Sequence, residues 1–442
     1  MKIEAPNRIE YILNLFFEAG FEAFAVGGCV RDSLLGKIPH DWDITTNARP
    51  QQIKEILKNF QTIDTGIRYG TVTLLYEGET VEITTYRLDM GYDDNRHPKD
   101  VKFSQSLRED LSRRDFTVNA MAYNRRSGLI DEFGGLEDLR NGIVRTVGSA
   151  EQRFAEDSLR ILRGLRFAAV LGFEIHRETA DAIHSCRSLL ANIAGERINK
   201  EFTALLLAED PARILREYFD VIGVFIPELP LLAGLQQNNP YHAYDVFEHT
   251  MKALEHTPAE KNIRYAVLFH DFGKAFTKST DQEGIDHFRN HPAVSERKAE
   301  LIMQRLKFSN REISRICLLI KYHDTPLLCD EYHLKRWLNR FGEDFIRDLL
   351  AVKKADIRGQ NPKLLHRLQE LPKYYALLEK IKHEEQCFKI SDLAVSGDDL
   401  LKIGYKPNRR LGKVMEHLLD EVMRGNVPNE KEALMQKAKL FK

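Results

Sequence analysis

FAVGGCVRDSLLG at residues 24–36, followed by HDWDITT at residues 40–46, decides how the start of this 442-residue chain folds. The apolar residues 24–26 predict a short strand that passes through Gly27 and Gly28 into an amphipathic helix. Glycines at such a turn let the backbone pass close to a bound group, and the N-terminus of the helix offers N–H donors suited to phosphate. Arg31, in the first helical turn, can add a bidentate contact to the same phosphate.

Asp41 and Asp43 follow two residues apart, so on a strand both carboxylates point to the same face. Two hard oxygen ligands beside a phosphate cradle are what Mg²⁺-assisted phosphoryl or nucleotidyl transfer requires. Each half of this pattern is common by itself, since most Gly-Gly turns are only turns and most Asp-x-Asp pairs are solvated. Their order and short separation favour the functional interpretation.

Composition describes an ordinary globular protein of two to four domains, with 43% hydrophobic and 30% charged residues and a net charge of -1. No segment approaches the ~20 uncharged apolar residues of a membrane span. The first twenty residues predict an amphipathic helix and not a signal peptide. Five scattered cysteines without a Cys-x-x-Cys pair indicate reduced thiols. We therefore expect a cytoplasmic protein with no membrane partner.

Helix and strand patterns alternate up to about residue 150, and helical patterns follow to the end of the chain. TVTLLYEGETVEITTYR (71–87) predicts a β-hairpin around Glu77-Gly78, and the run at 236–240 indicates a linker. The expected fold class is α+β, with a small α/β head followed by an all-helical neck, body and tail. The expected domains are 1–142, 143–236, 237–360 and 361–442.

Glu82 lies in the second arm of the predicted hairpin, between Val81 and Ile83. Alternation along a strand would point its side chain to one face, away from its two apolar neighbours. It is either a third carboxylate of the metal site or a solvent-facing strand residue, and both interpretations stay open.

The segment EDLSRRDFTVNAMAYN (109–124) brings Arg114, Asp115 and Asn119 together. Its pattern predicts a half-buried helix on which Asp115 and Asn119 are one turn apart. Such a group could hold a triphosphate and ribose hydroxyls.

AEDSLRILRGLRF (155–167) predicts a second helix of interest. Asp157, Arg160, Arg163 and Arg166 recur every three residues and form a stripe on one face. A single acid cannot neutralise the charge of three arginines. This favours an anion or a base edge beside them. Asp and Arg can each pair with the edge of a nucleobase.

GGCVRD, HDWDITT, RRDFTVNA and AEDSLRILRGLRF, in this order, resemble the bacterial class II tRNA nucleotidyltransferase and poly(A) polymerase family over roughly residues 20–230. The resemblance implies a nucleotidyltransferase-type head and the template-independent addition of CCA to the 3′ end of tRNA from CTP and ATP. An A-adding enzyme or a poly(A) polymerase of the same family is the alternative. The implied partners are tRNA, CTP and ATP, and the implied cofactor is Mg²⁺.

The same resemblance assigns roles to individual residues. It implies Mg²⁺ on Asp41 and Asp43, and it favours Glu82 as a further carboxylate. The residues implied to bind the nucleotide are Gly28, Arg31, Arg114, Glu156, Asp157, Arg160, Arg163 and Arg166.

YRLDMGYDDNRHPKDVKF (86–103) is polar, contains Gly91 and Pro98, and predicts a mobile loop. It is similar to the flexible loop of full CCA-adding enzymes, which helps their site switch from C to A. Enzymes that add only CC have a shortened loop, so its presence argues against that specialisation.

A second constellation lies in the helical part and combines histidines with aspartates. Its members in chain order are His249, His270, Asp271, His291, His323 and Asp356. This order resembles the HD superfamily of metal-dependent phosphohydrolases, and imidazole with carboxylate suits Mn, Ni or Co. The domain is either an active phosphohydrolase or a scaffold. An HD phosphohydrolase with an RNA-binding head is the alternative of another class, against which the intact Asp41–Asp43 pair argues.

The C-terminal tail is locally basic, with ten Lys or Arg and five Asp or Glu in residues 401–442. It resembles the family's tail, in which a helix begun by proline meets RNA. Lys406, Arg409, Arg410 and Lys413 precede or open that helix and are the expected phosphate contacts. A solvated helix end is the alternative.

Overall fold

The computed structural model describes residues 3–92, 98–384 and 386–441. The chain forms two compact units, Met1–Pro230 with Arg305–Phe308, and Leu231–Gln304 with Ser309–Lys442. The boundary after Pro230 comes before the linker predicted at 236–240. Throughout the described residues, no helix has both the length and the apolar character needed to cross a bilayer.

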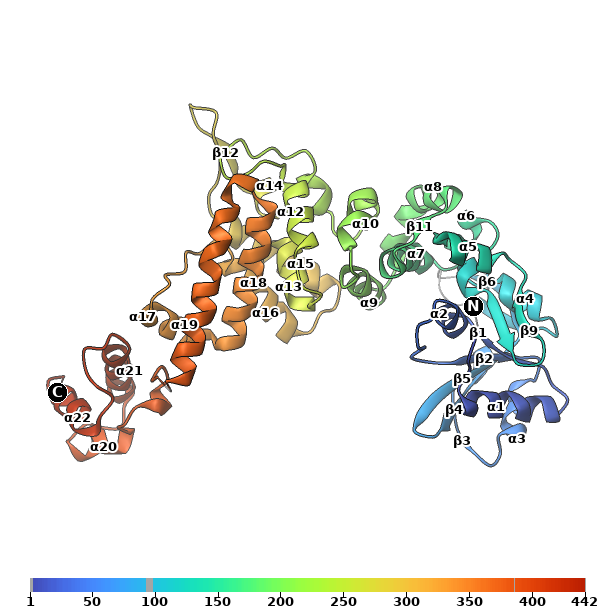
Figure 1. Cartoon of the computed structure of the whole chain (residues 1–442), viewed down its shortest axis with the longest axis horizontal. Coiled ribbons are helices and arrows are strands. Elements are labelled where there is room, and N and C mark those ends of the chain that lie inside the picture. The colour runs from blue at the N-terminus through green and yellow to red at the C-terminus, as the bar shows by residue number, and fades with distance from the viewer. Residues whose placement is uncertain (1–2, 93–97, 385, 442) are drawn as a thin grey trace. The chain divides into compact units, whose positions relative to one another are not determined.

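A seven-stranded sheet organises the first unit, in the order β3-β4-β5-β2-β1-β8-β9 (Figure 1). Its strands are β1 (Ala23–Val26), β2 (Asp43–Thr46), β3 (Gln61–Gly66), β4 (Thr71–Tyr76), β5 (Glu79–Thr85), β8 (Met121–Asn124) and β9 (Gly128–Asp131). β1 pairs antiparallel with β2 and β8, whereas β2 pairs parallel with β5. The centre of the sheet therefore brings the turn after β1 beside the start of β2.

Helices complete the first unit. They are α1 (Asn7–Glu18), α2 (Gly28–Leu34), α3 (Pro50–Ile56), α4 (Leu107–Ser112), α5 (Gly135–Asn141), α6 (Ala150–Glu156), α7 (Leu159–Leu171), α8 (Arg177–Cys186), α9 (Gly195–Leu206), α10 (Pro211–Glu217) and α11 (Phe219–Ile222). Short 3-10 turns cover Ile67–Tyr69, Thr117–Asn119, Arg187–Asn192 and Leu229–Leu232, and a two-stranded pair joins β10 (Ile143–Val144) to β11 (Glu174–Ile175). The predicted N-terminal helix, the strand–Gly-Gly–helix turn and the hairpin at Glu77-Gly78 are confirmed.

The single helix predicted over 109–124 is wrong. The chain instead forms α4, a 3-10 turn over Thr117–Asn119, and β8. Asp115 Oδ1 accepts a hydrogen bond from the N–H of Phe116, 2.9 Å away, a local bond of the kind that competes with helical hydrogen bonding. Ladder pairing of β8 with β1 and β9 then outweighs helical propensity.

The helix predicted over 155–167 is interrupted at Asp157, so the predicted common stripe with the arginines is wrong. Asp157 has an extended backbone (φ -137°, ψ 103°) between α6 and α7. Its Oδ1 accepts a hydrogen bond from the N–H of Leu159, 3.1 Å away, which is how aspartate caps the start of a helix. Asp157 therefore precedes α7, while the arginines lie on it.

The predicted loop at 86–103 contains two paired strands, β6 (Arg87–Tyr92) and β7 (Pro98–Phe103), which form a separate antiparallel sheet. The turn between them lies outside the described residues. The segment is therefore largely ordered as a ribbon, because its two polar arms satisfy their backbone groups by pairing with each other.

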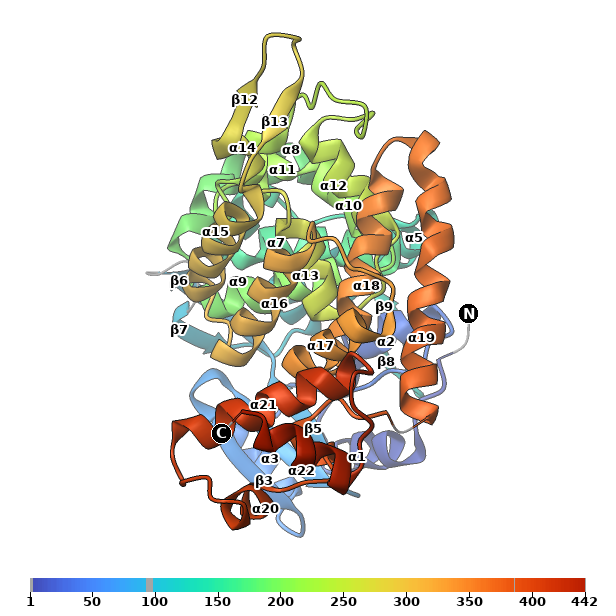
Figure 2. The same ribbon diagram turned by 90° about the vertical axis from the view of Figure 1, so that its left-hand side faces the viewer.

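The second unit is mainly helical (Figure 2). Its helices are α12 (Val246–Glu255), α13 (Lys261–Phe269), α14 (Lys274–Thr277), α15 (His291–Arg305), α16 (Asn310–Tyr322), α17 (Glu331–Phe341), α18 (Glu343–Gly359), α19 (Leu371–His383), α20 (Gly397–Lys402), α21 (Arg409–Met423) and α22 (Lys431–Lys439), with 3-10 turns at Pro362–Glu370 and Ile390–Asp392. The prediction of an all-helical region after the head is wrong at two points, because β10 pairs with β11 in the first unit, and β12 (Lys278–Thr280) and β13 (Asp286–Phe288) form a hairpin in the second. Figure 2 shows this hairpin projecting from the helices.

Candidate functional site

The carboxylates predicted to bind metal meet at the centre of the first unit's sheet. Asp43 is the first residue of β2 and pairs in register with Glu82 on the parallel strand β5. Trp42 is buried between exposed Asp41 and Asp43, so the expected alternation is present. The pKa of Asp43 is raised to about 6. Partial desolvation is the largest cause, the nearby Glu82 is the next, and Asp41 adds to the effect. Neighbouring carboxylates that disfavour one another's charge attract a divalent cation.

The glycine turn lies directly beside these carboxylates, since Val26 pairs with Asp43 across β1 and β2. Gly27 has φ 82° and ψ -131°, and a Cβ at this residue would lie 3.0 Å from Nη1 of Arg114. The backbone angles favour glycine, and a Cβ would also crowd the Arg114 guanidinium. The nucleotide-binding prediction for Gly28 concerns the first residue of α2, which follows immediately.

Two arginines border the turn. Arg31 Nη1 donates to Asn119 Oδ1 over 2.6 Å, and its Nε donates to Asp32 Oδ1 over 2.8 Å. Arg114 Nη2 lies 3.7 Å from Oδ2 of fully buried Asp110. Its charge also acts on Asp43, where it opposes the upward pKa shift. Arg31 and Arg114 thus place two guanidinium groups beside the glycine turn, and the charge of Arg114 reaches the carboxylates.

The arginines of α7 form ion pairs within the first unit, which corrects the expectation that they lack acidic partners. Arg163 Nη2 lies 2.6 Å from Asp115 Oδ2, and Arg166 Nε lies 2.6 Å from Glu201 Oε2. Although burial alone would raise it, Arg163 holds the pKa of Asp115 at about 2. The acids come from other parts of the fold, so spacing within the helix could not reveal them.

The residues implied to read the base are also held in place. Arg160 Nη1 contacts Glu156 Oε2 at 2.6 Å, and its Nη2 donates to the carbonyl of Arg113 over 3.1 Å. Asp157 Oδ2 lies 3.0 Å from Nη2 of Arg197, on α9. The sequence analysis missed Arg197, because no periodicity connects α9 to the break before α7. Both carboxylate and guanidinium retain donor or acceptor capacity for a base edge.

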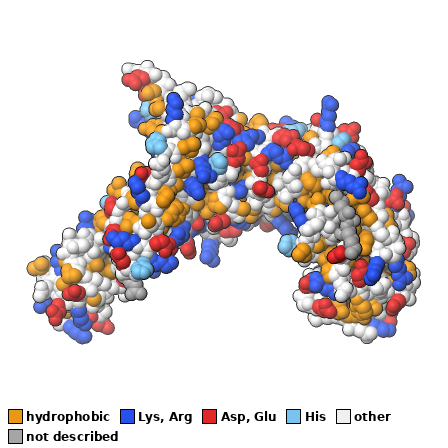
Figure 3. Space-filling view, viewed as in Figure 1, with side chains coloured by type: hydrophobic (Ala, Val, Ile, Leu, Met, Phe, Trp, Pro, Cys, Tyr) orange, Lys and Arg blue, Asp and Glu red, His pale blue; other side chains and the backbone are white. Residues whose placement is uncertain are grey.

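The predicted RNA contacts of the tail are exposed. Lys406 precedes α21, while Arg409, Arg410 and Lys413 lie at its start. The helix begins after the Asn408 cap, not at Pro407. On the face drawn in Figure 3, basic and acidic side chains of the tail are intermixed. The structure therefore leaves the RNA-binding role of these residues as a prediction.

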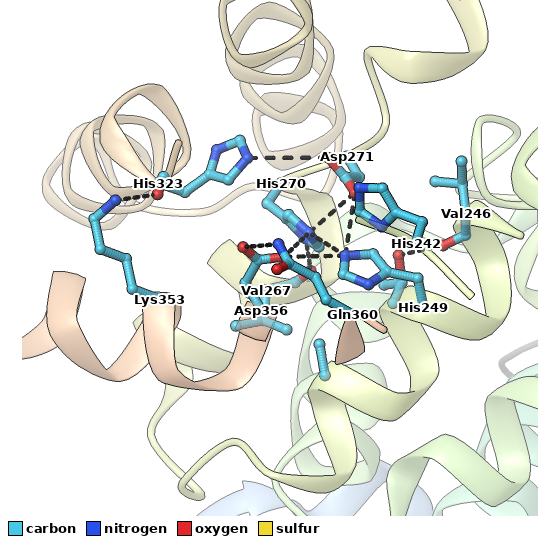
Figure 4. Close-up of polar contacts among 12 residues, drawn as sticks. His242, Val246, His249, Val267, His270, Asp271, His323, Lys353, Asp356 and Gln360 are labelled. Atoms are coloured by element: carbon cyan, nitrogen blue, oxygen red, sulfur yellow. Dashed lines mark hydrogen bonds and ion pairs between the residues drawn. The ribbon is translucent and has the colours of Figure 1, made fainter. Parts of the chain in front are cut away.

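The six residues of the second constellation converge in the second unit and are named the HD cluster below. Figure 4 shows all of them except His291. They come from α12 (His249), the residues just after α13 (His270, Asp271), the start of α15 (His291), the residue after α16 (His323) and α18 (Asp356). Potential ligand atoms group around His249–His270–Asp271 and around Asp271–His291–His323.

The potential ligand atoms of the HD cluster lie close to one another. His249 Nε2 lies 3.1 Å from Nε2 of His270 and 3.1 Å from Oδ1 of Asp356. His291 Nε2 lies 3.3 Å from both His323 Nε2 and Asp271 Oδ1. The Nδ1 atoms of His270 and His323 face the carbonyls of Val267 and Ile320, which leaves each Nε2 as the inward ligand.

Two histidines of the HD cluster have pKa values shifted in opposite directions. Burial is the largest influence on His270 and acts downward, but Asp271 and Asp356 together raise its pKa to about 10. Burial, with the nearby charge of His270, lowers the pKa of His323 to about 3. Buried His249 Nδ1 lacks a hydrogen bond to any described residue. Buried imidazoles and carboxylates are suitable ligands for a divalent metal ion.

Sequence reasoning also missed residues around the HD cluster. Lys274 Nζ lies 2.7 Å from Asp271 Oδ2, and the HDFGK spacing in the sequence was its signal. Gln360 Nε2 donates to Asp356 Oδ2 over 3.0 Å. The His242 ring lies 5.0 Å from the His249 ring, between ring centroids.

Three family descriptions match parts of the chain. Residues 23–145 match the poly A polymerase head domain, residues 172–231 match the probable RNA and SrmB-binding site of polymerase A, and residues 277–438 match a putative tRNA nucleotidyltransferase domain 2. The matches cover both units and include the glycine turn, the carboxylates and the tail.

Whole-length relatives agree with these matches. The chain is 34% identical to CCA-adding enzymes of Lactobacillus delbrueckii subsp. bulgaricus, over 96% of this chain and 95% of the relative, and of Ligilactobacillus salivarius, over 97% and 95%. A solved structure of the Bacillus stearothermophilus CCA-adding enzyme in complex with CTP is 27% identical and aligns with a TM-score of 0.72 over 98% of this chain and 96% of that one. A Thermotoga maritima CCA-adding enzyme complexed with tRNA_CCA shares the fold, at 21% identity and a TM-score of 0.60 over 99% and 96%.

Proposed function

Because this chain belongs to the class II family of CCA-adding enzymes, the tRNA nucleotidyltransferases, we propose that its first unit adds CMP and AMP residues to the 3′ end of tRNA. The observation that carries the proposal is that Asp43 pairs with Glu82 on one side and with Val26, next to the Gly27 turn, on the other, with the charge of Asp41 acting on Asp43. The substrates are CTP and ATP, and the product besides the extended tRNA is pyrophosphate.

Family members use a divalent metal, and we assign Mg²⁺ to Asp41 and Asp43, with Glu82 as a neighbouring carboxylate. When bound there, Mg²⁺ supplies positive charge to the phosphates and favours ionisation of the attacking hydroxyl. The crowding that raises the pKa of Asp43 supports this assignment, because a cation relieves it.

The remaining residues bind and orient the substrates. Gly27 and Gly28 let the triphosphate approach the backbone, while Arg31 and Arg114 neutralise its oxygens. The terminal ribose hydroxyl of the tRNA then forms a bond to the α-phosphorus, and the bond from that phosphorus to the β-phosphate oxygen breaks. The protein contributes mainly by positioning and by neutralising charge.

Base choice is assigned to Asp157 and Arg160. Each faces a protein partner, Arg197 or Glu156, that holds its side chain. A fixed carboxylate and a fixed guanidinium can present hydrogen-bonding atoms to the edges of cytosine and adenine without a nucleic-acid template. Arg163 and Arg166 lie on the same helix and are assigned to the nucleotide's phosphates, in exchange for part of their pairing with Asp115 and Glu201.

Transcripts of tRNA that end before CCA, after C and after CC test the assignment. Each is incubated with CTP alone, ATP alone and both nucleotides, and the products are resolved at single-nucleotide length. We expect C, then C, then A to be added in that order, with the reaction stopping after A. Addition of A to the CC-ending transcript with no C added to the others would instead identify an A-adding enzyme, and long A tracts would identify a poly(A) polymerase.

A second activity is favoured by the convergence of the HD cluster. We propose that these residues hold one or two transition-metal ions, with Mn, Ni and Co as candidates, and that the second unit hydrolyses phosphate esters. When bound, such a metal supplies Lewis acidity toward the phosphate. The packed helices fix the positions of these histidines and aspartates, because each residue lies at the end or on the face of a helix.

Metal content tests this second proposal without relying on turnover. The full-length protein is incubated with Mn²⁺, Ni²⁺ or Co²⁺, passed through gel filtration and measured by elemental analysis, beside His270→Ala and Asp271→Ala variants. We expect retained metal in the wild type and its loss in both variants. A wild-type protein that retains no metal and hydrolyses neither phosphomonoesters nor 2′,3′-cyclic nucleotides would reduce the domain to a scaffold.

A further inference from the structure

A cavity of about 970 Å³ opens beside the HD cluster in the second unit, and Asp271, His291, His323 and Asp356 form part of its wall. Small-molecule sites typically have volumes of about 300–1,000 Å³. The cavity therefore has room for far more than an inorganic phosphate. The ligand residues form only part of its lining, so the other lining residues can select what is bound.

Lys353, on α18, is the residue of this wall with the most unusual surroundings. Its Nζ donates to the carbonyl oxygen of His323 over 2.6 Å and to that of Thr325 over 2.7 Å. These bonds orient the ammonium group beside a predicted metal ligand, as Figure 4 shows. Both acceptors are neutral, and a lysine carries three donor protons. Within residues 3–92, 98–384 and 386–441, no carboxylate forms a salt bridge with Lys353.

Several other charged residues of the cavity have charged partners, whereas Arg367 donates to the neutral Gln360 Oε1 over 2.8 Å. Lys274 is engaged by Asp271 Oδ2 and by Gln237 Oε1, each at 2.7 Å. Asp286 is paired with Lys278 at 2.8 Å, and Glu370 with Lys373 at 2.8 Å. Asp356 and Asp324, which also border the cavity, are near enough for their charges to act on Lys353. Lys353 is thus an oriented cation that is largely removed from water.

An apolar surface lies on the same cavity wall as Lys353. Leu327, Leu371 and Tyr374 line it, and Tyr374 is fixed because its hydroxyl donates to the carbonyl of Leu327 over 2.6 Å. Such a surface suits a flat or cyclic organic group, whereas the ligand side suits a phosphate. The two sides of the cavity match the two halves of an organic phosphate ester.

We propose that this cavity is the substrate site of the HD cluster, that Lys353 binds the phosphate of an organic phosphate ester, and that the ester's organic group packs on Leu327, Leu371 and Tyr374. The inference rests on the second proposed function above. In the reaction, a water oxygen bonds to phosphorus, the ester P–O bond breaks, and the released alcohol oxygen takes a proton. Water is the only co-reactant, and the products are an alcohol and phosphate from a monoester, or an alcohol and a phosphate monoester from a diester.

The test uses full-length protein loaded with Mn²⁺, and substitutes Lys353→Gln, which keeps chain length and hydrogen bonding but removes the charge. Lys353→Arg keeps the charge, and Lys354→Gln is the matched control, because Lys354 is the exposed neighbour on the same helix. Leu327→Ala probes the apolar surface. The measurements are metal content, the Kd of phenylphosphonate by calorimetry, and kcat and KM for methyl phosphate, p-nitrophenyl phosphate and bis(p-nitrophenyl) phosphate.

We expect Lys353→Gln to retain its Mn²⁺ and to weaken phenylphosphonate binding at least about tenfold, a typical loss for a charge-assisted hydrogen bond. KM for whichever aryl ester is hydrolysed should rise in parallel, Lys353→Arg should restore part of the affinity, and Lys354→Gln should match the wild type. Leu327→Ala should reduce the preference for the aryl ester over methyl phosphate. Turnover of the monoester or of the diester shows which kind of ester the site takes.

Two negative results have different meanings. Protein that retains Mn²⁺ and hydrolyses an aryl ester, but whose Lys353→Gln variant binds phenylphosphonate as the wild type does, overturns the assignment of Lys353 and leaves the second function standing. Wild-type protein that retains no metal and hydrolyses no ester overturns both.

Discussion

The two candidate sites of this chain hold their charged side chains in opposite ways. In the first unit, Arg163 and Arg166 form ion pairs with the acids Asp115 and Glu201. Asp43 and Glu82 are in-register neighbours on adjacent strands. In the second unit, histidines and aspartates from five helices point their ligand atoms at one another within a buried cluster. In the first arrangement, arginines paired with protein acids could pair with a phosphate instead. In the second, the grouped ligand atoms could hold a metal ion.

This difference predicts how each site responds to substitution. In the first unit the carboxylates are the proposed metal ligands, and the other assigned residues supply charge and hydrogen bonds around the nucleotide. Removing a metal ligand should therefore be far more damaging than removing any one binding residue. In the second unit, any ligand substitution should remove metal but leave the first unit's chemistry unchanged, because the two clusters belong to separate compact units.

The largest effect is expected for Asp41→Ala and Asp43→Ala. Loss of metal-stabilised charge costs several kcal/mol of barrier, so nucleotide incorporation should fall by at least about 100-fold. Binding of tRNA, measured by gel shift, should stay within about threefold of wild type, because these carboxylates are assigned to metal and not to RNA. Asp64→Ala is the matched control, as Asp64 is an exposed acid on β3 of the same sheet. Near wild-type incorporation by either variant would show that the metal site is elsewhere.

The β6–β7 ribbon should give the next largest effect, and an uneven one. Deleting residues 90–100 should spare addition of the two C residues within about threefold and should slow addition of the final A by at least about tenfold. The reason is that the segment is assigned to the change of site between C and A, and supplies neither metal ligand nor phosphate contact. Incorporation into transcripts ending before CCA and after CC measures the two steps separately. Equal loss of both would make the ribbon part of the common active site.

Base choice should change by smaller factors. Asp157→Ala and Arg160→Ala should each reduce the preference for CTP and ATP over UTP and GTP by about 5- to 100-fold, because a good base-edge contact is worth ~1–3 kcal/mol. Arg197→Met should relax the preference less, since it removes only the partner that orients Asp157. Competition assays with labelled nucleotides give the ratios, and exposed Arg177→Ala on α8 is the control. An equal slowdown with all four nucleotides would assign these residues to phosphate binding alone.

Sequence patterns predicted the parts of both sites that depend on short-range geometry. The Asp41–Trp42–Asp43 alternation, the Gly27 turn and the hairpin that carries Glu82 all follow from spacing along one or two strands. The HD cluster followed from residue order. Patterns failed where tertiary pairing decides, as in β8, which joins the sheet, and in the acid partners of the α7 arginines, which come from α9 and from the turn after α4. Asp157 was misplaced because a favourable helix cap outweighed the continuous helical periodicity.

The smallest effect sharpens the contrast between the sites. The double substitution of His270 and Asp271 by alanine should remove bound Mn²⁺ and leave CCA addition within about threefold of wild type. The physical reason is that these residues are buried in the second unit, whereas the carboxylates and arginines assigned to nucleotide transfer all belong to the first. Circular dichroism and gel filtration establish that the variant is folded, because removing a buried network can unfold a domain. Loss of CCA addition in a folded variant would show that the HD cluster supports the transferase site, and the two sites could then no longer be treated as independent.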